Sequence, residues 1–379
     1  MLLRYADFRA RARVRLPRFV FDYVDSGAED ESCLARNERD LADCHLLPLC
    51  LRNTTKVDTT VEVFGQRWSG PVGIAPLGFS GLVRPDGDVL LAMAAAKAGV
   101  PFVLSTASNA RLESVRAAVP SASTQWMQLY VMSDRGIAEQ MVRRAKVAGY
   151  GALVLTVDVP VSGLRERDVR NGFKLPFRPS LRTLADLVTH PGWSLSMARQ
   201  GSPSFVNLAE GDSQSSARLQ AALLARAMDR SLVWDSLTWL RSLWDGPLLI
   251  KGVLNPADAS LAVRHGVDGI VVSNHGGRQL DAAPSTISVL PRVLDATAGR
   301  IPVFVDSGFR RGSDVLKAIA LGARAAFIGR PAMWGLAADG EQGVSSVLRL
   351  FLEEIARTMT LIGNTELADL KPRQVVHPV

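Results

Sequence analysis

Short, almost entirely apolar runs recur along the chain and alternate with longer segments whose apolar residues follow a helical spacing. An apolar run without polar alternation is typical of a parallel strand that is covered on both faces. Several of the intervening segments begin with capping residues or proline, as at Asn255-Pro256. The pattern predicts eight strands, at 72–76, 101–105, 125–130, 152–158, 248–252, 269–274, 303–308 and 325–330.

Strands that alternate with helices eight times predict an α/β fold, a closed (β/α)8 barrel of the TIM type. A doubly wound sheet is the alternative fold. It would more naturally carry a GxGxxG fingerprint after its first strand, and this chain contains no such string.

The 379 residues are expected to form one domain, 1–379. Residues 1–70 precede the first strand and are predicted to form a helical cap with a short hairpin. The barrel is predicted at 71–335, followed by C-terminal helices at 336–379. An insertion at 159–247 separates the fourth and fifth strands, and it is far longer than one crossover requires, so a functional or disordered segment is expected there.

The composition is that of a globular chain, with 47% hydrophobic and 21% charged residues and a net charge of +7. A basic balance is compatible with nucleic acid, an anionic membrane surface or anionic small substrates. The basic residues are scattered, without a run of five or more, which argues against nucleic acid.

The three cysteines, Cys33, Cys44 and Cys50, form no CxxC pair and no zinc pattern, so no metal site is expected. Free thiols are typical of a reducing cytosol. The N-terminus lacks the apolar region of a secretory signal, and no run of 18 apolar residues exists. A cytoplasmic protein is therefore expected.

Polar residues gather at the predicted carboxyl ends of the strands, where the chemistry of such barrels is found. Burying polar groups without partners is costly, so their presence indicates a bound polar cofactor. These residues are Ser105, Gln128, Tyr130, Thr156, Asp158, Lys251, Ser273, His275, Arg278, Asp306, Arg310 and Arg330.

The string SNHGGRQLD at 273–281 places a histidine at a strand end, followed by two glycines that allow a sharp turn beside a flat ligand. Arg278 follows His275 by three residues, and an arginine can hold a carboxylate by two parallel hydrogen bonds. A base beside a carboxylate clamp suits oxidation at a carbon next to a carboxylate.

The last two strand ends, in VDSGFRRGSD and FIGRP, correspond to the usual phosphate site of this barrel. Gly308 and Gly329 supply backbone N–H groups there, and Arg310 and Arg330 supply positive charge. Alternatively, the two arginines only pair with surface carboxylates.

Two further residues allow more than one interpretation. Lys251 either forms a Schiff base, as in a barrel lyase without flavin, or places a positive charge near an electron-rich ring. A lyase of this kind would give His275 no role. Asp158 either stabilises the protonated imidazole of His275 or caps a helix.

These motifs together resemble the family of FMN-dependent 2-hydroxy acid dehydrogenases and oxidases, over almost the whole chain from FDYVDSGAED at 21–30 to GRP at 329–331. The resemblance implies that His275 is the active-site base and Asp158 its carboxylate partner. It implies substrate contacts for Tyr23, Tyr130, Arg165 and Arg278. The implied FMN contacts are Pro76, Leu77, Gly78, Ser105, Gln128, Thr156, Lys251, Ser273, Asp306, Ser307, Gly308, Phe309, Arg310, Gly329 and Arg330.

Within the family, strings such as VLSTASN, GLRERDVRN and HPGWSL are most similar to the mandelate-oxidising members. Glycine at position 78 is typical of the dehydrogenases, whereas the oxidases usually carry alanine. The implied reaction converts (S)-mandelate to benzoylformate, by hydride or by carbanion chemistry, and passes electrons to a membrane quinone. An L-lactate dehydrogenase and an oxidase that uses oxygen and releases hydrogen peroxide remain the alternatives.

The resemblance also implies a homotetramer and a peripheral contact of 178–216 with the inner face of the cell membrane. The apolar and basic mixture of this segment is what interfacial attachment requires, although a disordered or partner-facing loop is the alternative. The chain departs from the oxidases at Val161 and Leu164, where they carry an arginine pair. We expect these two residues to form an apolar pocket wall.

Overall fold

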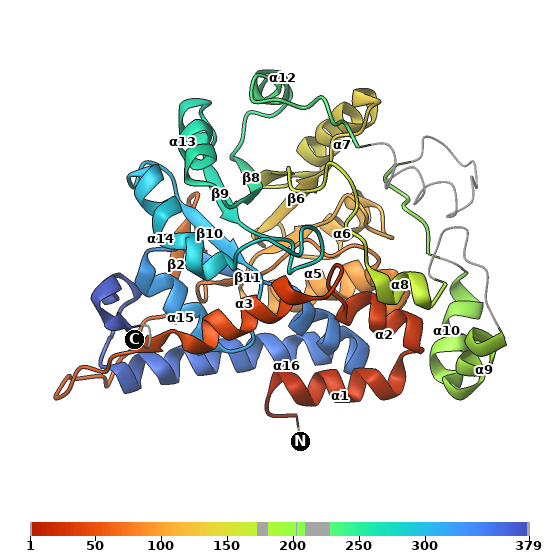
Figure 1. Cartoon of the computed structure of the whole chain (residues 1–379), viewed down its shortest axis with the longest axis horizontal. Helices are drawn as coiled ribbons and strands as arrows, with labels where there is room; N and C mark the ends of the chain where they lie inside the picture. The colour runs from red at the N-terminus through yellow and green to blue at the C-terminus, as the bar shows by residue number, and fades with distance from the viewer. Residues whose placement is uncertain (1, 173–180, 202, 209–227, 377–379) are drawn as a thin grey trace.

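The computed structural model describes residues 2–172, 181–201, 203–208 and 228–376. Eight parallel strands form a closed barrel, as predicted, in which the last strand pairs with the first (Figure 1). The strands are β4 (Val72–Ile74), β5 (Phe102–Leu104), β6 (Gln125–Leu129), β7 (Ala152–Thr156), β8 (Leu248–Val253), β9 (Gly269–Val272), β10 (Val303–Asp306) and β11 (Ala325–Ile328).

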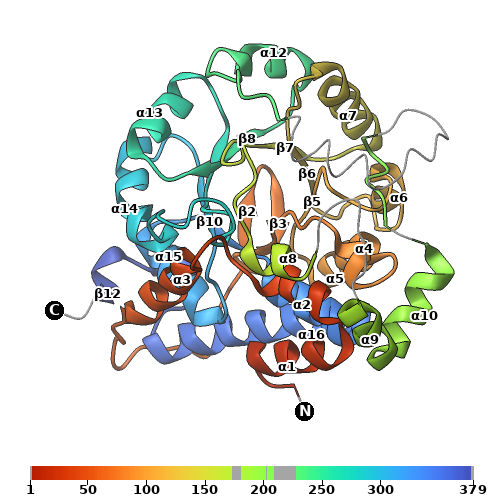
Figure 2. The same ribbon diagram turned by 45° about the vertical axis from the view of Figure 1, so that its right-hand side comes forward.

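Helices surround the strands on the outside of the barrel, which is most easily followed in Figure 2. They cover the outer face of every strand, so each strand is buried on both sides. These helices are α5 (Gly87–Ala98), α6 (Leu112–Ala117), α7 (Arg135–Ala148), α12 (Ser236–Leu243), α13 (Pro256–Arg264), α14 (Thr286–Thr297), α15 (Gly312–Leu321) and α16 (Arg330–Ile362), with the short α4 (Ser80–Val83) after β4.

Successive residues of a strand point alternately into the barrel and toward the helices. In β7, Ala152 and Val154 belong to the cluster inside the barrel, whereas Leu153 and Leu155 belong to the larger cluster beneath the helices. Both sets are buried. The apolar runs of the sequence therefore reflect two cores, one on each face of the strands.

The amino-terminal end of the barrel is closed by a hairpin of β2 (Val61–Val63) and β3 (Gln66–Trp68). The Trp68 ring lies 5.5 Å from that of Trp126 and 6.3 Å from that of Phe304, between ring centroids. Aromatic rings thus fill this end, and a ligand has access only from the carboxyl ends of the strands.

Three helices precede the hairpin, α1 (Tyr5–Arg15), α2 (Arg18–Asp25) and α3 (Ser32–Asp43). The Trp334 indole of α16 donates to the Tyr5 hydroxyl at 2.8 Å and stacks on the Phe21 ring at 5.0 Å. The helix α16 is interrupted by non-helical backbone at Asp339 and Gly340. Packing on α16 places α2 beside the barrel mouth (Figure 1).

The segment after α16 runs back to the N-terminal part of the chain and pairs with it. Two 3-10 turns, Leu367–Asp369 and Pro372–Gln374, lead into β12 (Val375–Val376), which pairs antiparallel with β1 (His45–Leu46). The prediction of helices throughout 336–379 therefore does not hold beyond the end of α16, because the chain turns to form this short sheet.

Several strands end earlier than predicted. The strand β9 ends at Val272, so Ser273 and His275 lie in the following loop, and Arg330 belongs to α16. The polar residues inferred to end strands therefore lie mostly in loops, where their side chains and backbone can turn toward a ligand.

The insertion after β7 contains α8 (Glu166–Arg170), α9 (Leu181–Thr189) and α10 (Pro191–Gln200). The Trp193 indole donates to the Leu82 carbonyl at 2.9 Å and meets the Phe19 ring edge-on at 5.6 Å. The helix α10 is thereby docked beside α2. Parts of the predicted membrane segment 178–216, namely 178–180, 202 and 209–216, lie outside the described residues.

A helix able to cross a membrane was not found among the residues that the structure describes.

Candidate active site

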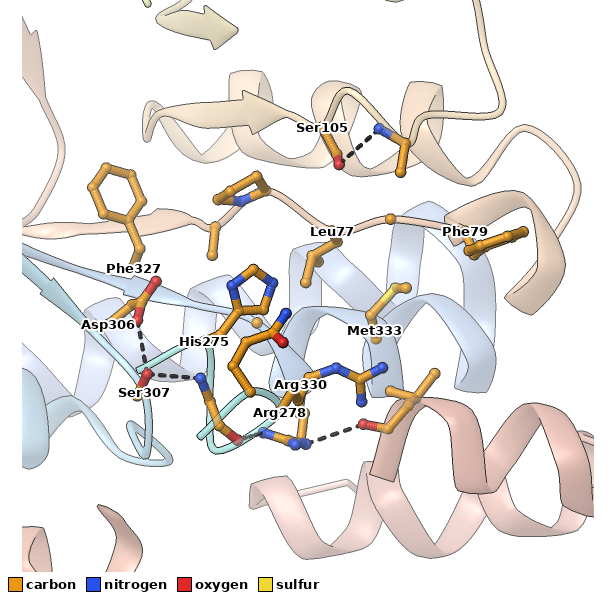
Figure 3. Close-up of a pocket in the computed structure, with 18 of the residues that line it drawn as sticks. Leu77, Phe79, Ser105, His275, Arg278, Asp306, Ser307, Phe327, Arg330 and Met333 are labelled. Carbon is orange, nitrogen blue, oxygen red and sulfur yellow. Dashed lines mark hydrogen bonds between the residues drawn. The ribbon is translucent and has the colours of Figure 1, made fainter. Parts of the chain in front are cut away.

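A cavity of about 840 Å³ opens at the carboxyl ends of the barrel strands. Figure 3 shows His275 near its centre, with Leu77 on one side and Arg278 and Arg330 on the other. The predicted site residues that line it are Tyr23, Pro76, Leu77, Gly78, Ser105, Tyr130, Arg165, Lys251, His275, Arg278, Asp306, Ser307, Gly308, Phe309, Arg310, Gly329 and Arg330. The remaining four, Gln128, Thr156, Asp158 and Ser273, are not among its lining residues but contact or adjoin it.

The His275 imidazole is held on both of its nitrogens. Its Nδ1 lies 3.1 Å from Asp158 Oδ1, and its Nε2 lies 3.4 Å from the Tyr130 hydroxyl. A carboxylate at Nδ1 orients the ring and stabilises its protonated form. Nε2 is therefore the nitrogen that faces the tyrosine and the cavity.

The backbone around His275 has an uncommon conformation. His275 has a φ of 59°, and Gly276 and Gly277 follow with φ of 67° and 73°. Three consecutive residues in the left-handed region require glycine at all but one position, and a non-glycine residue there stores strain. This turn directs the imidazole into the cavity and explains the double glycine in the sequence.

Lys251, Asp306 and Ser273 form a buried polar cluster beside the imidazole. The Lys251 ammonium donates to Ser273 Oγ at 2.7 Å and lies 3.1 Å from Asp306 Oδ2. Burial lowers the pKa of Lys251, but Asp306 and Asp158 raise it above the ordinary value. The two carboxylates therefore favour the charged form of the lysine, whereas Schiff-base formation requires a neutral amine.

The Asp158 carboxylate is likewise held in its charged form. Burial raises its pKa, but His275 and Lys251 outweigh burial and hold the pKa below the ordinary value. The imidazole therefore has one carboxylate at its Nδ1, and Lys251 adds a positive charge that acts on the same carboxylate.

Two guanidinium groups lie over the ring of Tyr23. Arg278 lies 5.0 Å and Arg165 5.9 Å from the ring centroid. Arg278 donates through Nη1 to the Tyr23 and Ser26 carbonyls at 2.7 and 3.0 Å, and Arg165 pairs with Asp168 at 2.7 Å. Burial and the nearby Arg165 lower the pKa of Arg278. An anion bound here would relieve the repulsion between the two cations.

Positive charge also gathers at the predicted phosphate side. Arg330 donates to the carbonyls of Val24, Ser26 and Gly276. Its pKa is lowered to about 9 by burial and then by Arg278 and Arg310. Arg310 pairs with Glu38 at 2.6 Å but also lines the cavity, so pairing with a surface carboxylate does not remove it from the site.

The residues present fit an FMN molecule. Within the described chain, the buried Gln128 Nε2 and Thr156 Oγ1 have no hydrogen-bond partner. Buried polar atoms are normally paired, so these two atoms indicate that a polar ligand binds here. Gln128 Oε1 is already used by Thr106 N at 3.0 Å, which fixes the amide with its Nε2 free. Buried arginines at the β10 and β11 ends suit a phosphate, and the cavity has the size of a cofactor site.

The structure corrects one expectation and adds residues that the sequence did not indicate. Val161 and Leu164 are 47% and 55% exposed, and neither lines the cavity, so they do not form its apolar wall. The apolar lining comes instead from Phe79, Ala107, Phe205 and Met228, among others. Phe205 and Met228 lie in the insertion, where no periodicity or motif marks them.

A (β/α)8 barrel whose mouth brings together an imidazole and buried arginines is typical of a class of flavin-dependent oxidoreductases. Comparison with known proteins supports this class. The family model described as FMN-dependent dehydrogenase matches residues 12–377, and the chain belongs to this family. The expected cofactor, FMN, and the expected enzyme class, which oxidises 2-hydroxy acids, are confirmed.

The relatives are similar over nearly their full lengths. The chain is 45% identical to (S)-mandelate dehydrogenase of Pseudomonas putida over 371 residues, covering 98% of this chain and 93% of that protein. It is 41% identical to L-lactate dehydrogenase of Vibrio parahaemolyticus, with 98% and 97% covered. A crystal structure of the monotopic membrane protein (S)-mandelate dehydrogenase superposes with a TM-score of 0.96, at 44% identity and full coverage of both chains.

Proposed function

We propose that this FMN-dependent dehydrogenase oxidises (S)-mandelate to benzoylformate, with His275 as the base. One observation carries the proposal. The cavity brings an imidazole held by a carboxylate together with two arginines and two tyrosines, which is the donor set that a 2-hydroxy acid needs.

The substrate carboxylate binds Arg165 and Arg278. Tyr23 lies beneath both guanidinium groups, and burial raises the pKa of its hydroxyl, which stays protonated and able to donate. Fixing the carboxylate in this way orients the adjacent carbon, and such positioning contributes much of an enzymatic rate.

His275 accepts one proton from the substrate at Nε2, either from the α-carbon or from its hydroxyl. Asp158 stabilises the resulting imidazolium through Nδ1. Tyr130, whose pKa is raised by burial and by Asp158, remains a neutral donor beside Nε2. When bound, FMN supplies the acceptor for the two electrons that leave the substrate.

Lys251 and Ser273 would contact the flavin ring, whereas Asp306, Ser307, Gly308, Phe309, Arg310, Gly329 and Arg330 would lie on the phosphate side. The side chain of Ser307 already links Asp306 Oδ1 at 2.8 Å to the Gly276 N–H at 2.9 Å, which ties the two loops together. The remaining contacts proposed for FMN are Pro76, Leu77, Gly78, Ser105, Gln128 and Thr156.

We further propose that the enzyme is a homotetramer that attaches to the membrane surface and reduces a quinone there. The helices α9 and α10 expose Leu184, Val188 and Leu195, of which Val188 is 78% exposed. Exposed apolar side chains on surface helices are what interfacial attachment uses. The relative of known structure that is described as a monotopic membrane protein supports this proposal.

L-lactate oxidation is the second candidate, supported by the 41% identity to L-lactate dehydrogenases. Steady-state turnover of the full-length flavoprotein with both enantiomers of mandelate and lactate distinguishes the two. A quinone analogue and oxygen are compared as acceptors, since rapid oxygen uptake would instead indicate an oxidase. Loss of turnover in His275→Ala, with flavin absorbance retained, is expected. Undiminished turnover in that variant would contradict the assignment of the base.

A further inference from the structure

One end of the cavity is apolar and is built partly by the insertion. It is lined by Phe79, Ala107, Phe205 and Met228. The Phe79 and Phe205 rings meet edge to face, with centroids 4.4 Å apart and planes at 65°. In Figure 3, Phe79 lies on the opposite side of the view from Asp306, so this end is remote from the phosphate side. We call these four residues the apolar wall.

The apolar wall adjoins the proposed carboxylate site. The Tyr23 ring, which carries Arg165 and Arg278 above it, meets the Phe79 ring edge-on at 5.6 Å. Tyr130, beside His275 Nε2, packs against the cluster that contains Phe205. A 2-hydroxy acid held by both arginines, with its reacting carbon at His275, therefore has the apolar wall available for its side chain.

Phe205 is fixed in the wall by hydrogen bonds from its neighbours in sequence. Asn109 Nδ2 donates to the Ser204 carbonyl at 3.0 Å. The Asn207 side chain accepts from Leu112 N at 3.0 Å and donates to the Ala110 carbonyl at 2.9 Å. Phe205 and Asn207 are each only 1% exposed. A buried and fully used amide of this kind holds its backbone in one position.

Met228 is fixed by a different set of contacts. It forms an antiparallel bridge with Met132, and Asp229 N donates to the Val131 carbonyl at 3.0 Å. Asp229 also pairs with Arg135 at 2.9 Å. Two separate parts of the insertion, 203–208 and 228–229, are thus docked on the loops after β5 and β6, and each contributes an apolar side chain to the cavity.

We propose that Phe205 and Met228 are specificity-determining residues that select a 2-hydroxy acid with a large apolar side chain, and that Asn207 is the residue that positions Phe205. The inference rests on the proposed function and names the part of the insertion that sets its substrate class. An aryl group packs against the wall, whereas the methyl group of lactate covers little of it.

The test measures kcat/KM for (S)-mandelate and for L-lactate with the same soluble artificial acceptor. In Phe205→Ala and in Met228→Ala the value for (S)-mandelate falls by about 10- to 100-fold, while that for L-lactate stays within about twofold. Asn207→Ala raises KM for (S)-mandelate without changing kcat for L-lactate, which separates positioning from general instability. Phe205→Leu, which keeps an apolar side chain of similar size, recovers most of the selectivity.

Val233→Ala is the matched control, because Val233 belongs to the same insertion but is 63% exposed and does not line the cavity. In this control, the ratio of kcat/KM for (S)-mandelate to kcat/KM for L-lactate is expected to equal that of the wild type. The inference is overturned if the wild type prefers lactate, or if kcat/KM falls equally for both substrates in Phe205→Ala and Met228→Ala. Oxidation of 2-hydroxy acids still stands in either case. If the FMN-loaded wild type oxidises neither substrate, the proposed function itself fails.

Discussion

His275 Nδ1 lies 3.1 Å from Asp158 Oδ1, although the two residues are 117 positions apart in the chain. Asp158 follows β7 and His275 follows β9, and the strand between them, β8, carries Gly252. A Cβ added to Gly252 would lie 2.6 Å from the Asp158 Cβ, closer than real Cβ contacts allow. The contact between base and carboxylate therefore depends on a glycine in the intervening strand.

Replacing Asp158 by asparagine is expected to lower kcat by about 100-fold with the flavin content unchanged. The amide can still orient Nδ1, but it lacks the negative charge that stabilises a protonated imidazole. Steady-state turnover and visible absorbance of the purified variant measure the two effects. Asp235→Asn, at an exposed position before α12, serves as the control and retains full turnover. A fully active Asp158→Asn enzyme would remove this carboxylate from the mechanism.

Gly252→Ala is expected to reduce both stability and turnover. Gly252 has a φ of 105°, which L residues rarely adopt, and its added methyl group would collide with Asp158. Gly266→Ala is the matched control, because Gly266 also has a positive φ, of 69°, but has nothing within 4 Å of an added Cβ. Both variants lose about 1 kcal/mol or more of stability through backbone strain, but only Gly252→Ala also loses turnover. Equal turnover in the two variants would argue against crowding at Asp158.

Asp306→Asn is expected to lower the stability of the protein most at neutral pH, with a smaller deficit at alkaline pH. Burial lowers the pKa of Lys251, but Asp306 and Asp158 raise it above 10.5. Because the folded pKa exceeds the unfolded one, this group stabilises the fold fully below pH 10.5, and the contribution is lost as pH rises through the folded pKa. Without Asp306 the folded pKa is lower, so the stabilisation that Lys251 contributes below pH 10.5 is smaller, and the variant has less to lose than the wild type as pH rises.

Thermal unfolding of both proteins at about pH 7 and about pH 11 measures this difference. Asp245→Asn removes the same charge at a surface pair with Lys146 and is the control. We expect Asp306→Asn to unfold at a lower Tm than the wild type at the lower pH and this gap in Tm to narrow at the higher pH, whereas the control follows the wild type at both. A gap of the same size at both pH values would show that Asp306 does not sustain the charge of Lys251.

Thiol labelling of the folded enzyme is expected at Cys50 alone. Burial raises the pKa of Cys33 to about 11 and also raises that of Cys44, so both remain protonated thiols that react poorly. Cys50 is exposed. Iodoacetamide at about pH 8, followed by mass spectrometry of peptides, should find one modified cysteine in the folded protein and all three after denaturation. Rapid labelling of Cys33 would show that α3 opens readily.

Much of the architecture could be predicted because its signals are local. Each barrel strand is an apolar run since it is buried on both faces, and the double glycine after His275 marks a turn in the left-handed region. The strand ends were placed too late, as at β9, because hydrophobicity does not show where pairing with neighbouring strands stops.

The order of apolar and polar residues by itself determined the barrel and the polar residues at its mouth, and motifs such as SNHGGRQLD indicated the family. Only the tertiary structure decided which apolar residues reach the cavity: Val161 and Leu164 turn to solvent, whereas Phe205 and Met228 turn inward. The reason is physical. Periodicity reports the face that a residue shows within its own helix or strand, but Phe205 and Met228 belong to neither, and their side chains are directed by contacts with the loops after β5 and β6.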